Sequence, residues 1–578
     1  MNISGKLFAS LAILGTALLT GCNKSDDAYG KFDYLAVQED EDGNWSFIGP
    51  DHKVICDGDF KNMPTSVYNG LFSVKEGEGY SVYTIDGDKA KLVDGCEGLR
   101  EVGALEDGVM PAVFPNERIS LLDKNGHKVA TIEPVKGKEI VKITAQASDG
   151  LFEVMNEDGK WGYVDTKGKV VIEPKYDGSW TMKDGMAAVY TTDDKGDNEY
   201  SVINSKGEQV FKIRKGYGVY SSFCEGLLLV KDNNDRYLLY DTKGEVVTKL
   251  PQKVSDVRDF NSKYVIFGTT DDVVGVMDTE GNIVVRAKYK GIQFMGADKF
   301  LAAADDYVAI LNANGDEEQR MDDYSATMYL GKFGIIALEG KTLSFLDDKG
   351  KPVKNCDFNN TNFQPFTSYV LDSDYVDTQA IVKAVVDMIG TDGIGKWHIG
   401  DTAGNHLSNP GEHLFESSVA IEELKKTGYH YEIEAKAQFG SYFADYDYSG
   451  ANFSRREYWT DAAVNSFVIE VTVNPEFGIA CGNAVVKGLV NAGFKVVSAS
   501  EEGKDGLMAS LKKGDLLVVV GCDKGTAVGN IGVFKYTTET AEYFKSLVDQ
   551  VNDGSISNEP DAVEEVDSVA VEMPAGAR

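Results

Sequence analysis

The chain has 578 residues, with 58 Lys and Arg against 92 Asp and Glu, which gives a formal net charge of −34. A surface this acidic repels the phosphates of nucleic acids, so we expect no nucleic-acid partner. The length leaves room for several domains. Beyond the N-terminal segment, no stretch approaches the roughly 20 apolar residues that a membrane-spanning helix needs, so we expect a soluble body.

Residues 1–21 have the features of an export signal. Lys6 precedes an apolar stretch that runs to Leu19, and small residues precede Cys22. The sequence Leu-Thr-Gly-Cys that ends at Cys22 resembles the bacterial lipobox, in which the cysteine becomes the lipidated first residue of the mature protein. This resemblance implies a signal peptide over 1–21, palmitate or a similar acyl chain at Cys22, and a membrane partner bound through that lipid anchor.

Residues 22–34 are predicted to form an acidic tether. Ser25, Asp26 and Asp27 resemble the surface-export signal of Bacteroidetes lipoproteins, although a plain solvated linker explains them equally well. The position after Cys22 is not Asp, so the pattern that retains lipoproteins in the inner membrane of enteric bacteria is absent. We therefore expect an outer-membrane protein that is exposed on the cell surface or, alternatively, faces the periplasm.

A strand-turn-strand unit recurs over residues 35–360. Its most complete copy spans 159–177, where an Asp-x-x-Gly turn separates two runs of β-forming residues. Equivalent turn glycines lie 34 to 42 residues apart, at Gly87, Gly126, Gly168, Gly207, Gly244, Gly281, Gly315 and Gly350. A weaker ninth copy covers 44–51. Such near-periodic spacing indicates a repeat architecture.

Several copies carry a further turn and strand before the repeated unit. Gly70, Gly150, Gly185 and Gly226 each begin an apolar run, so these units hold at least three antiparallel strands. A sheet of about 37 residues cannot bury both of its faces alone, so neighbouring sheets must stack on it. The pattern predicts a mainly β, propeller-like domain of about eight blades, with an open β-solenoid as the alternative.

The copy around Trp161 and Gly162 resembles the WG-repeat family of bacterial proteins. Units of that family carry Glu/Asp-Gly-Leu, then Lys-Trp-Gly-Phe-Ile-Asp, then a glycine turn and Ile-x-Pro-x-Tyr-Asp. Elsewhere the repeats diverge, and Gly275, for example, follows Val274 rather than a tryptophan. The resemblance implies a WG-repeat lipoprotein like those of Bacteroidetes. We expect Trp161 and the other aromatic residues of the repeats to lie in the blade cores.

The composition changes near residue 360. Residues 357–365 are predicted to form a polar linker, 366–552 a smaller α+β domain with a ferredoxin-like arrangement, and 553–578 an acidic, disordered tail. The predicted helices cover 378–389, 417–426, 477–492 and 538–551, and the predicted strands cover 429–439, 467–473, 494–498, 516–520 and 531–536. Asp377 is expected to cap the first of these helices.

The sequence contains no recognisable catalytic, nucleotide-binding or cofactor motif. The six histidines lack metal-site spacing. Asp445, Asp447 and Ser449 begin like a calcium loop, but Arg456 occupies the position of the bidentate glutamate, so they are weak metal candidates. Aromatic residues crowd the same segment and are candidates for stacking on sugar rings, with a core-covering loop as the alternative; these candidates are Tyr446, Tyr448, Tyr458 and Trp459.

These observations favour an exported, lipid-anchored and non-enzymatic protein that binds or scaffolds through its repeat domain. Two other functions stay open. The C-terminal domain would be an envelope enzyme if it held a convergent charged pocket, and the protein would bind surface glycans if it exposed a row of aromatic residues. The sequence does not identify the ligand, which is a protein or a glycan.

Overall fold

The computed structural model describes residues 31–38, 43–296, 298–322, 324, 326–339, 342–407, 418–439, 463–473, 478–501 and 506–554. The chain divides into two compact units, residues 1–373 (unit 1) and 374–578 (unit 2). No helix in these described ranges is long and apolar enough to cross a membrane. The predicted signal peptide, Cys22 and the C-terminal tail lie outside them.

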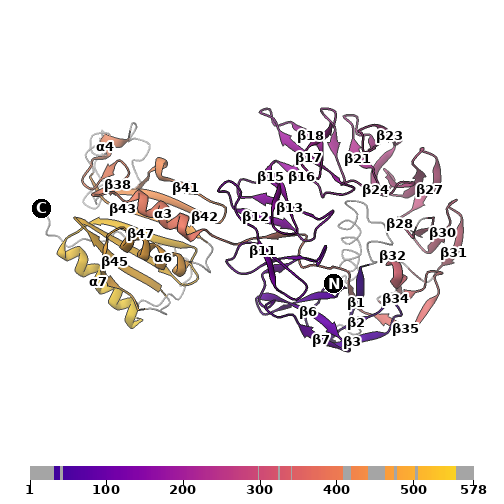
Figure 1. Cartoon of the computed structure of the whole chain (residues 1–578), viewed down its shortest axis with the longest axis horizontal. Coiled ribbons are helices and arrows are strands. Elements are labelled where there is room, and N and C mark those ends of the chain that lie inside the picture. The colour runs from indigo at the N-terminus through magenta and orange to yellow at the C-terminus, as the bar shows by residue number, and fades with distance from the viewer. Residues whose placement is uncertain are drawn as a thin grey trace, which may run out of the picture. The chain divides into compact units, whose positions relative to one another are not determined.

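Unit 1 is a ring of small antiparallel sheets around a centre (Figure 1). Eight groups of four antiparallel strands follow one another along the described chain, with strands in sequence order; the first group belongs to a larger sheet, and the third gains a fifth strand. The first four are β4 (Val67–Tyr68), β5 (Leu71–Glu76), β6 (Gly79–Asp86), β7 (Lys89–Leu92); β8 (Glu101–Val102), β9 (Met110–Val113), β10 (Ser120–Leu122), β11 (Lys128–Thr131); β12 (Ile140–Thr144), β13 (Leu151–Asn156), β14 (Trp161–Asp165), β15 (Val170–Tyr176); β16 (Gly178–Ser179), β17 (Met186–Thr192), β18 (Asn198–Asn204), β19 (Gln209–Lys212). The next four are β20 (Gly218–Val219), β21 (Leu228–Lys231), β22 (Tyr237–Tyr240), β23 (Val246–Lys249); β24 (Val254–Phe260), β25 (Tyr264–Thr269), β26 (Val274–Asp278), β27 (Ile283–Tyr289); β28 (Gly291–Phe294), β29 (Phe300–Ala303), β30 (Val308–Leu311), β31 (Glu317–Met321); β32 (Ala326–Tyr329), β33 (Ile335–Glu339), β34 (Thr342–Leu346), β35 (Pro352–Phe358).

Both ends of unit 1 contribute to one further sheet, which closes the ring. β1 (Phe32–Gln38) pairs with β2 (Trp45–Ile48) on one side and with β36 (Asn360–Asn362) on the other, while β3 (Val54–Phe60) adds to β2. β37 (Val370–Asp372) then pairs with β12 on the inner side of its sheet. The polar linker predicted over 357–365 is therefore wrong, because this segment supplies the closing strand and unit 1 extends to Ser373.

The repeated turn found in the sequence joins the third and fourth strands of each sheet. All eight predicted turn glycines have positive φ, between 67° and 92°. In most of these turns the first residue is Asp or Asn, and its side chain accepts backbone amides two and four positions later; Asp165 Oδ1, for example, accepts from Lys167 and Lys169, each at 2.9 Å. In the weaker ninth copy the equivalent left-handed position is His52. The predicted strand-turn-strand unit is thus confirmed.

Turn glycines also allow the sheets to pack closely. A Cβ at Gly168 would lie 2.8 Å from Ala130 Cβ, and one at Gly244 would lie 2.7 Å from the Phe211 ring, each in the preceding sheet. The prediction that Trp161 lies in a blade core is wrong, because Trp161 is only half-buried. The core role belongs to Tyr163, which is fully buried and donates a hydrogen bond to the Trp180 carbonyl at 2.8 Å.

Unit 2 is built around an antiparallel sheet in the order β40-β42-β43-β47-β46-β45-β44, with β41 also paired to β42. Its described elements are α3 (Thr378–Met388), β38 (Gly393–Ile394), β39 (Trp397–His398), α4 (Ala403–His406), β40 (Ser418–Ala420), β41 (Lys426–Thr427), β42 (Tyr431–Phe439), β43 (Val464–Val473), α6 (Gly478–Asn491), β44 (Lys495–Ala499), β45 (Gly506–Lys513), β46 (Leu516–Asp523), β47 (Val528–Lys535) and α7 (Thr538–Asp553). Asp377 caps α3 as predicted.

Two expectations for unit 2 are wrong. The helix predicted over 417–426 is replaced by β40, a short 3-10 turn and β41, because Ser418 to Ala420 pair with Gln438 to Lys436 at the sheet edge. The ferredoxin-like arrangement is not found either. β43 and β44 flank α6 in the chain, but three strands separate them in the sheet.

Candidate functional site

The sequence-predicted site residues mostly lie outside the described part of the chain. This holds for Cys22, for the weak metal candidates Asp445, Asp447 and Ser449, and for the aromatic candidates Tyr446, Tyr448, Tyr458 and Trp459. They stay predictions. A candidate site in the described part of the chain therefore consists of other side chains.

Histidines of unit 2 form pairs with carboxylates rather than a catalytic cluster. His398 Nδ1 lies 2.8 Å from Asp392, and His406 Nε2 lies 2.8 Å from Asp401 while its ring stacks on Trp397. Burial opposes ionisation of Asp401, but the hydrogen bonds from His406 and from the His398 amide outweigh it, so its pKa is lowered. No group of three or more metal-ligating side chains occurs in the described ranges.

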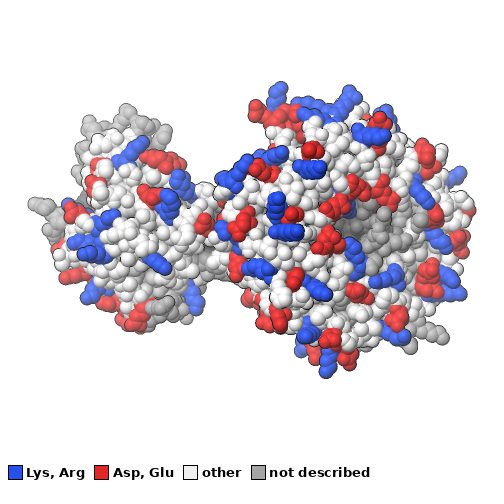
Figure 2. Space-filling model, in the orientation of Figure 1, with Lys and Arg blue, Asp and Glu red and all other residues white. Residues whose placement is uncertain are grey.

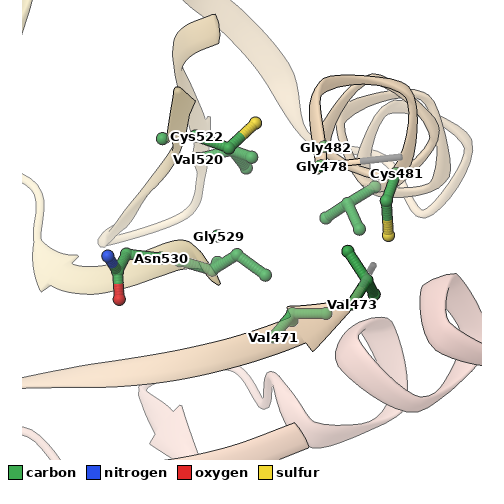
Figure 3. A pocket seen from close by; sticks show the side chains of 12 residues that line it. Val471, Val473, Gly478, Cys481, Gly482, Val520, Cys522, Gly529 and Asn530 are labelled. Carbon is green, nitrogen blue, oxygen red and sulfur yellow. The ribbon is translucent and has the colours of Figure 1, made fainter. Parts of the chain in front are cut away.

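An apolar cavity lies between α6 and the sheet of unit 2 (Figure 3). Cys481 on α6 and Cys522 on β46 line it together with glycine and valine residues. Burial raises the pKa of Cys481 to about 11 and that of Cys522 to about 12, so both thiols stay protonated near neutral pH. Their side chains point in different directions in Figure 3. This cavity is apolar and differs from the convergent charged pocket that would favour the enzyme alternative.

A more polar groove lies where the closing sheet (β36, β1, β2 and β3) meets the last sheet (β32–β35), and we call it the closure groove. Its volume is about 570 Å³. Turns between strands of both sheets line it with an ammonium group, an imidazole, a phenol and two carboxylates; the residues are Pro50, His52, Tyr329, Gly331, Lys332, Gly334, Asp347 and Asp348. The size is in the range of small-ligand sites, and the mixed charges suit a polar or zwitterionic group.

His52 holds the two walls of the closure groove together. It comes from the β2–β3 turn, and its Nε2 donates to the carbonyl of Phe333 in the last sheet at 2.8 Å. Its ring also meets Phe345 edge-on, with the ring centroids 5.1 Å apart. The groove is thus built from segments nearly 300 positions apart in the sequence and depends on closure of the ring.

Carboxylates tie successive sheets together on the same rim. In the turn between the first and second strands, Asp149 Oδ2 accepts the amide of Gly185, and Asp184 Oδ2 accepts that of Gly226, both at 2.8 Å. Glu225 continues the series by accepting the Ser262 amide at 2.9 Å. We call Asp149, Asp184 and Glu225 the inner-turn carboxylates. These contacts give a structural role to the acidic residue that precedes the glycine in the Glu/Asp-Gly element. This role was not predicted from the sequence, although the regular spacing of the element along the chain was visible.

Two further ionisable groups lie near these inner turns. Burial raises the pKa of Asp259, on β24, to about 7, although the positive charge of Lys183 opposes this shift. Burial also lowers the pKa of Lys183, although Asp184 and Asp149 oppose that shift. Both groups come from sheets that are not sequence neighbours, so no local pattern could have identified them.

A family model described as "WG containing repeat" matches residues 161–195. The chain contains a WG repeat there. No curated protein matches the chain. Among solved structures it is similar to BamB from Moraxella catarrhalis, at 14% identity and a TM-score of 0.26 over 49% of this chain and 92% of that one. It is also similar to the C-terminal WD40 domain of Sif2, at 11% identity and a TM-score of 0.27 over 43% and 82%. Scores this low carry no functional argument.

Proposed function

We propose that the protein is a lipid-anchored binding or scaffolding module that holds its ligand on the rim of a nine-bladed, propeller-like ring. The observation that carries this proposal is the closure groove, which gathers charged and polar side chains from the closing sheet and the last sheet. A ring of repeated sheets gives such a groove rigid walls. Unit 2 is proposed to be an α+β accessory domain.

The described side chains support ligand binding better than they support catalysis. Lys332, Tyr329 and Asp348 offer an ammonium, an aromatic ring and a carboxylate within one groove, which suits recognition of a polar ligand. The histidine–aspartate pairs of unit 2 do not line its cavity, which is apolar. These features support a module without a reaction of its own.

Anchoring is proposed at Cys22. The lipobox-like sequence that ends at Cys22 supports it, as does the apolar stretch before that sequence. Acyl chains would then hold the protein at the outer membrane, facing either the cell surface or the periplasm. In the Cys22→Ala variant, the full-length protein should appear in the soluble fraction or keep its leader. A processed variant that still fractionates with membranes would reject this anchor.

The binding proposal is tested by capture from native envelope extract with the full-length protein. Lys332→Glu reverses a charge in the closure groove, whereas Lys212→Glu makes the same change on the exposed outer strand β19 and serves as the matched control. Material that the wild type and Lys212→Glu retain, but Lys332→Glu loses, would support the groove. Equal capture by all three proteins would reject it. Sensitivity of the captured material to protease or to periodate then separates a protein ligand from a glycan.

A further inference from the structure

Strand β44 forms one edge of the sheet in unit 2. It pairs with β45 on one side, and in the described part of the chain no strand covers its other side. Val496 is 50% exposed and Val497 is 40% exposed, although valine is among the residues that are most often buried in folded proteins. An edge of this kind offers unpaired backbone groups and apolar side chains to another strand.

The charges at this edge favour an acidic occupant. Lys495 lies directly opposite Lys512 in the register of β44 and β45, and Lys513 follows on the same strand. Like charges placed directly opposite each other in a sheet are destabilising. A second copy pairing through the same edge would bring further lysines to it. A strand with a carboxylate opposite Lys495 would instead relieve the repulsion.

The chain beyond α7 starts next to this edge. Asn552, in the last turn of α7, accepts the backbone amide of Glu501 at 2.7 Å, just past the end of β44. α7 ends at Gly554, which has a left-handed conformation. From there 24 residues remain, 555–578, with six acids and one arginine. A strand that starts at this end of β44 and returns along it runs antiparallel to it.

One segment of these 24 residues has a strand pattern. Ser568 to Met573 reads Ser-Val-Ala-Val-Glu-Met, in which apolar β-forming residues alternate with small or charged ones. Thirteen residues, 555–567, separate Gly554 from Ser568, and this length spans up to about 45 Å when extended. We propose that residues 568–572 add to the edge of β44 as an additional antiparallel strand. This strand would latch the C-terminal tail to unit 2.

The proposal fixes a register. Pairing Ala499 with Ser568 places Val496 opposite Val571 and Lys495 opposite Glu572. The valine pair covers the exposed apolar surface, and the ion pair offsets the Lys495–Lys512 repulsion. The strand docks within its own chain, because its starting point at Gly554 already lies beside the edge.

Amide hydrogen exchange of the full-length protein tests this docking. Amides of β44 should exchange at least tenfold faster in a variant that stops after Gly554, while amides of the central strand β47 stay unchanged and report an intact sheet. Lys495→Glu should speed exchange in the same way, and the double variant Lys495→Glu with Glu572→Lys should restore protection. Glu559→Lys, which changes a tail acid outside the strand, is the control and should have no effect.

Three outcomes would overturn the proposal. One is equal exchange of β44 in the full-length and shortened chains. Another is failure of the double variant to restore protection. The third is protection that rises with protein concentration and survives the truncation, since this would assign the edge to a second copy of the chain.

Discussion

The two units build their sheets in opposite ways. In unit 1, each of eight sheets is made from strands that follow one another in the chain, so that β17, β18 and β19 are joined by tight turns. In unit 2, the central pairing joins Ser466 on β43 to Phe534 on β47, with a helix and three strands between them in the sequence. Local sheets leave a periodic trace in a sequence, and long-range sheets do not.

The two units also differ in where they depend on contacts between residues that are far apart in the sequence. Unit 1 needs them where β37 pairs with β12 and where its two ends meet, at the Ala36–Asn362 pair and the hydrogen bond from His52 to Phe333. The candidate binding groove lies at that junction. Unit 2 needs distant contacts along its whole sheet, and the exposed strand β44 marks where the sheet stops.

The core of a local sheet should depend on its fully buried tyrosine. Tyr163→Ala should lower the free energy of unfolding of unit 1 by about 3–5 kcal/mol, as for other large aromatic residues in cores. Tyr163→Phe, which loses only the hydrogen bond to Trp180, should cost about 1 kcal/mol. Trp161→Ala should cost less than Tyr163→Ala because Trp161 is half-buried. Denaturant unfolding measures all three, and a larger loss for Trp161→Ala would contradict the assignment.

Asp259 should make unit 1 less stable as the pH rises. Its pKa is about 7 in the folded protein and about 4 when unfolded, so the folded state holds more protons between these values. Stability therefore falls from pH 4 to pH 7, by about 1.4 kcal/mol for each unit of pKa difference. Asp259→Asn should remove this dependence, so that its melting temperature relative to the wild type rises from pH 5 to pH 8. Parallel melting curves for both proteins across this range would refute the shift.

Sheet packing should make some turn glycines harder to replace than others. Gly315 has φ of 81°, and a Cβ there would lie 2.4 Å from the Val284 carbonyl oxygen of the preceding sheet. Gly87 has a similar φ of 67° but nothing within 4 Å. Gly87→Ala should cost about 1–2 kcal/mol from backbone strain alone, and Gly315→Ala about 1–3 kcal/mol more. Equal costs in thermal unfolding would show that sheet contacts at these turns contribute nothing.

Two acidic side chains that contribute similar stabilisation should report on the unfolding of different units. Asp184 accepts the Gly226 amide between sheets of unit 1, and Asp377 caps α3 of unit 2 by accepting the amides of Gln379 and Ala380. Replacing either by Ala should cost about 1 kcal/mol. In calorimetry, Asp184→Ala should lower one unfolding transition and Asp377→Ala another. If both variants lowered the same transition, the units would not unfold separately.

Repeats in the sequence predicted the strands, the turns and the left-handed glycines of unit 1, because each is set by residues within about ten positions. The polar residues Asn360 to Asn362 predict a linker, and only their pairing with β1 makes them the strand β36. The family resemblance predicts Trp161 in the core, but the nearby Tyr163 occupies it. The closure groove was not predicted, since it joins residues from the two ends of unit 1.

Closure of the ring can be tested by the distance between two spin labels. Spin labels on cysteines introduced at Lys53 and Lys349 would lie in the third-to-fourth-strand turns of the closing sheet and the last sheet, beside the closure groove. The ring predicts one short distance, below about 30 Å even with label linkers included, because these turns flank a single groove. An open solenoid that stacks nine sheets at about 10 Å would separate them by about 80 Å. A distance of that size would contradict the closed ring and, with it, the proposed binding groove.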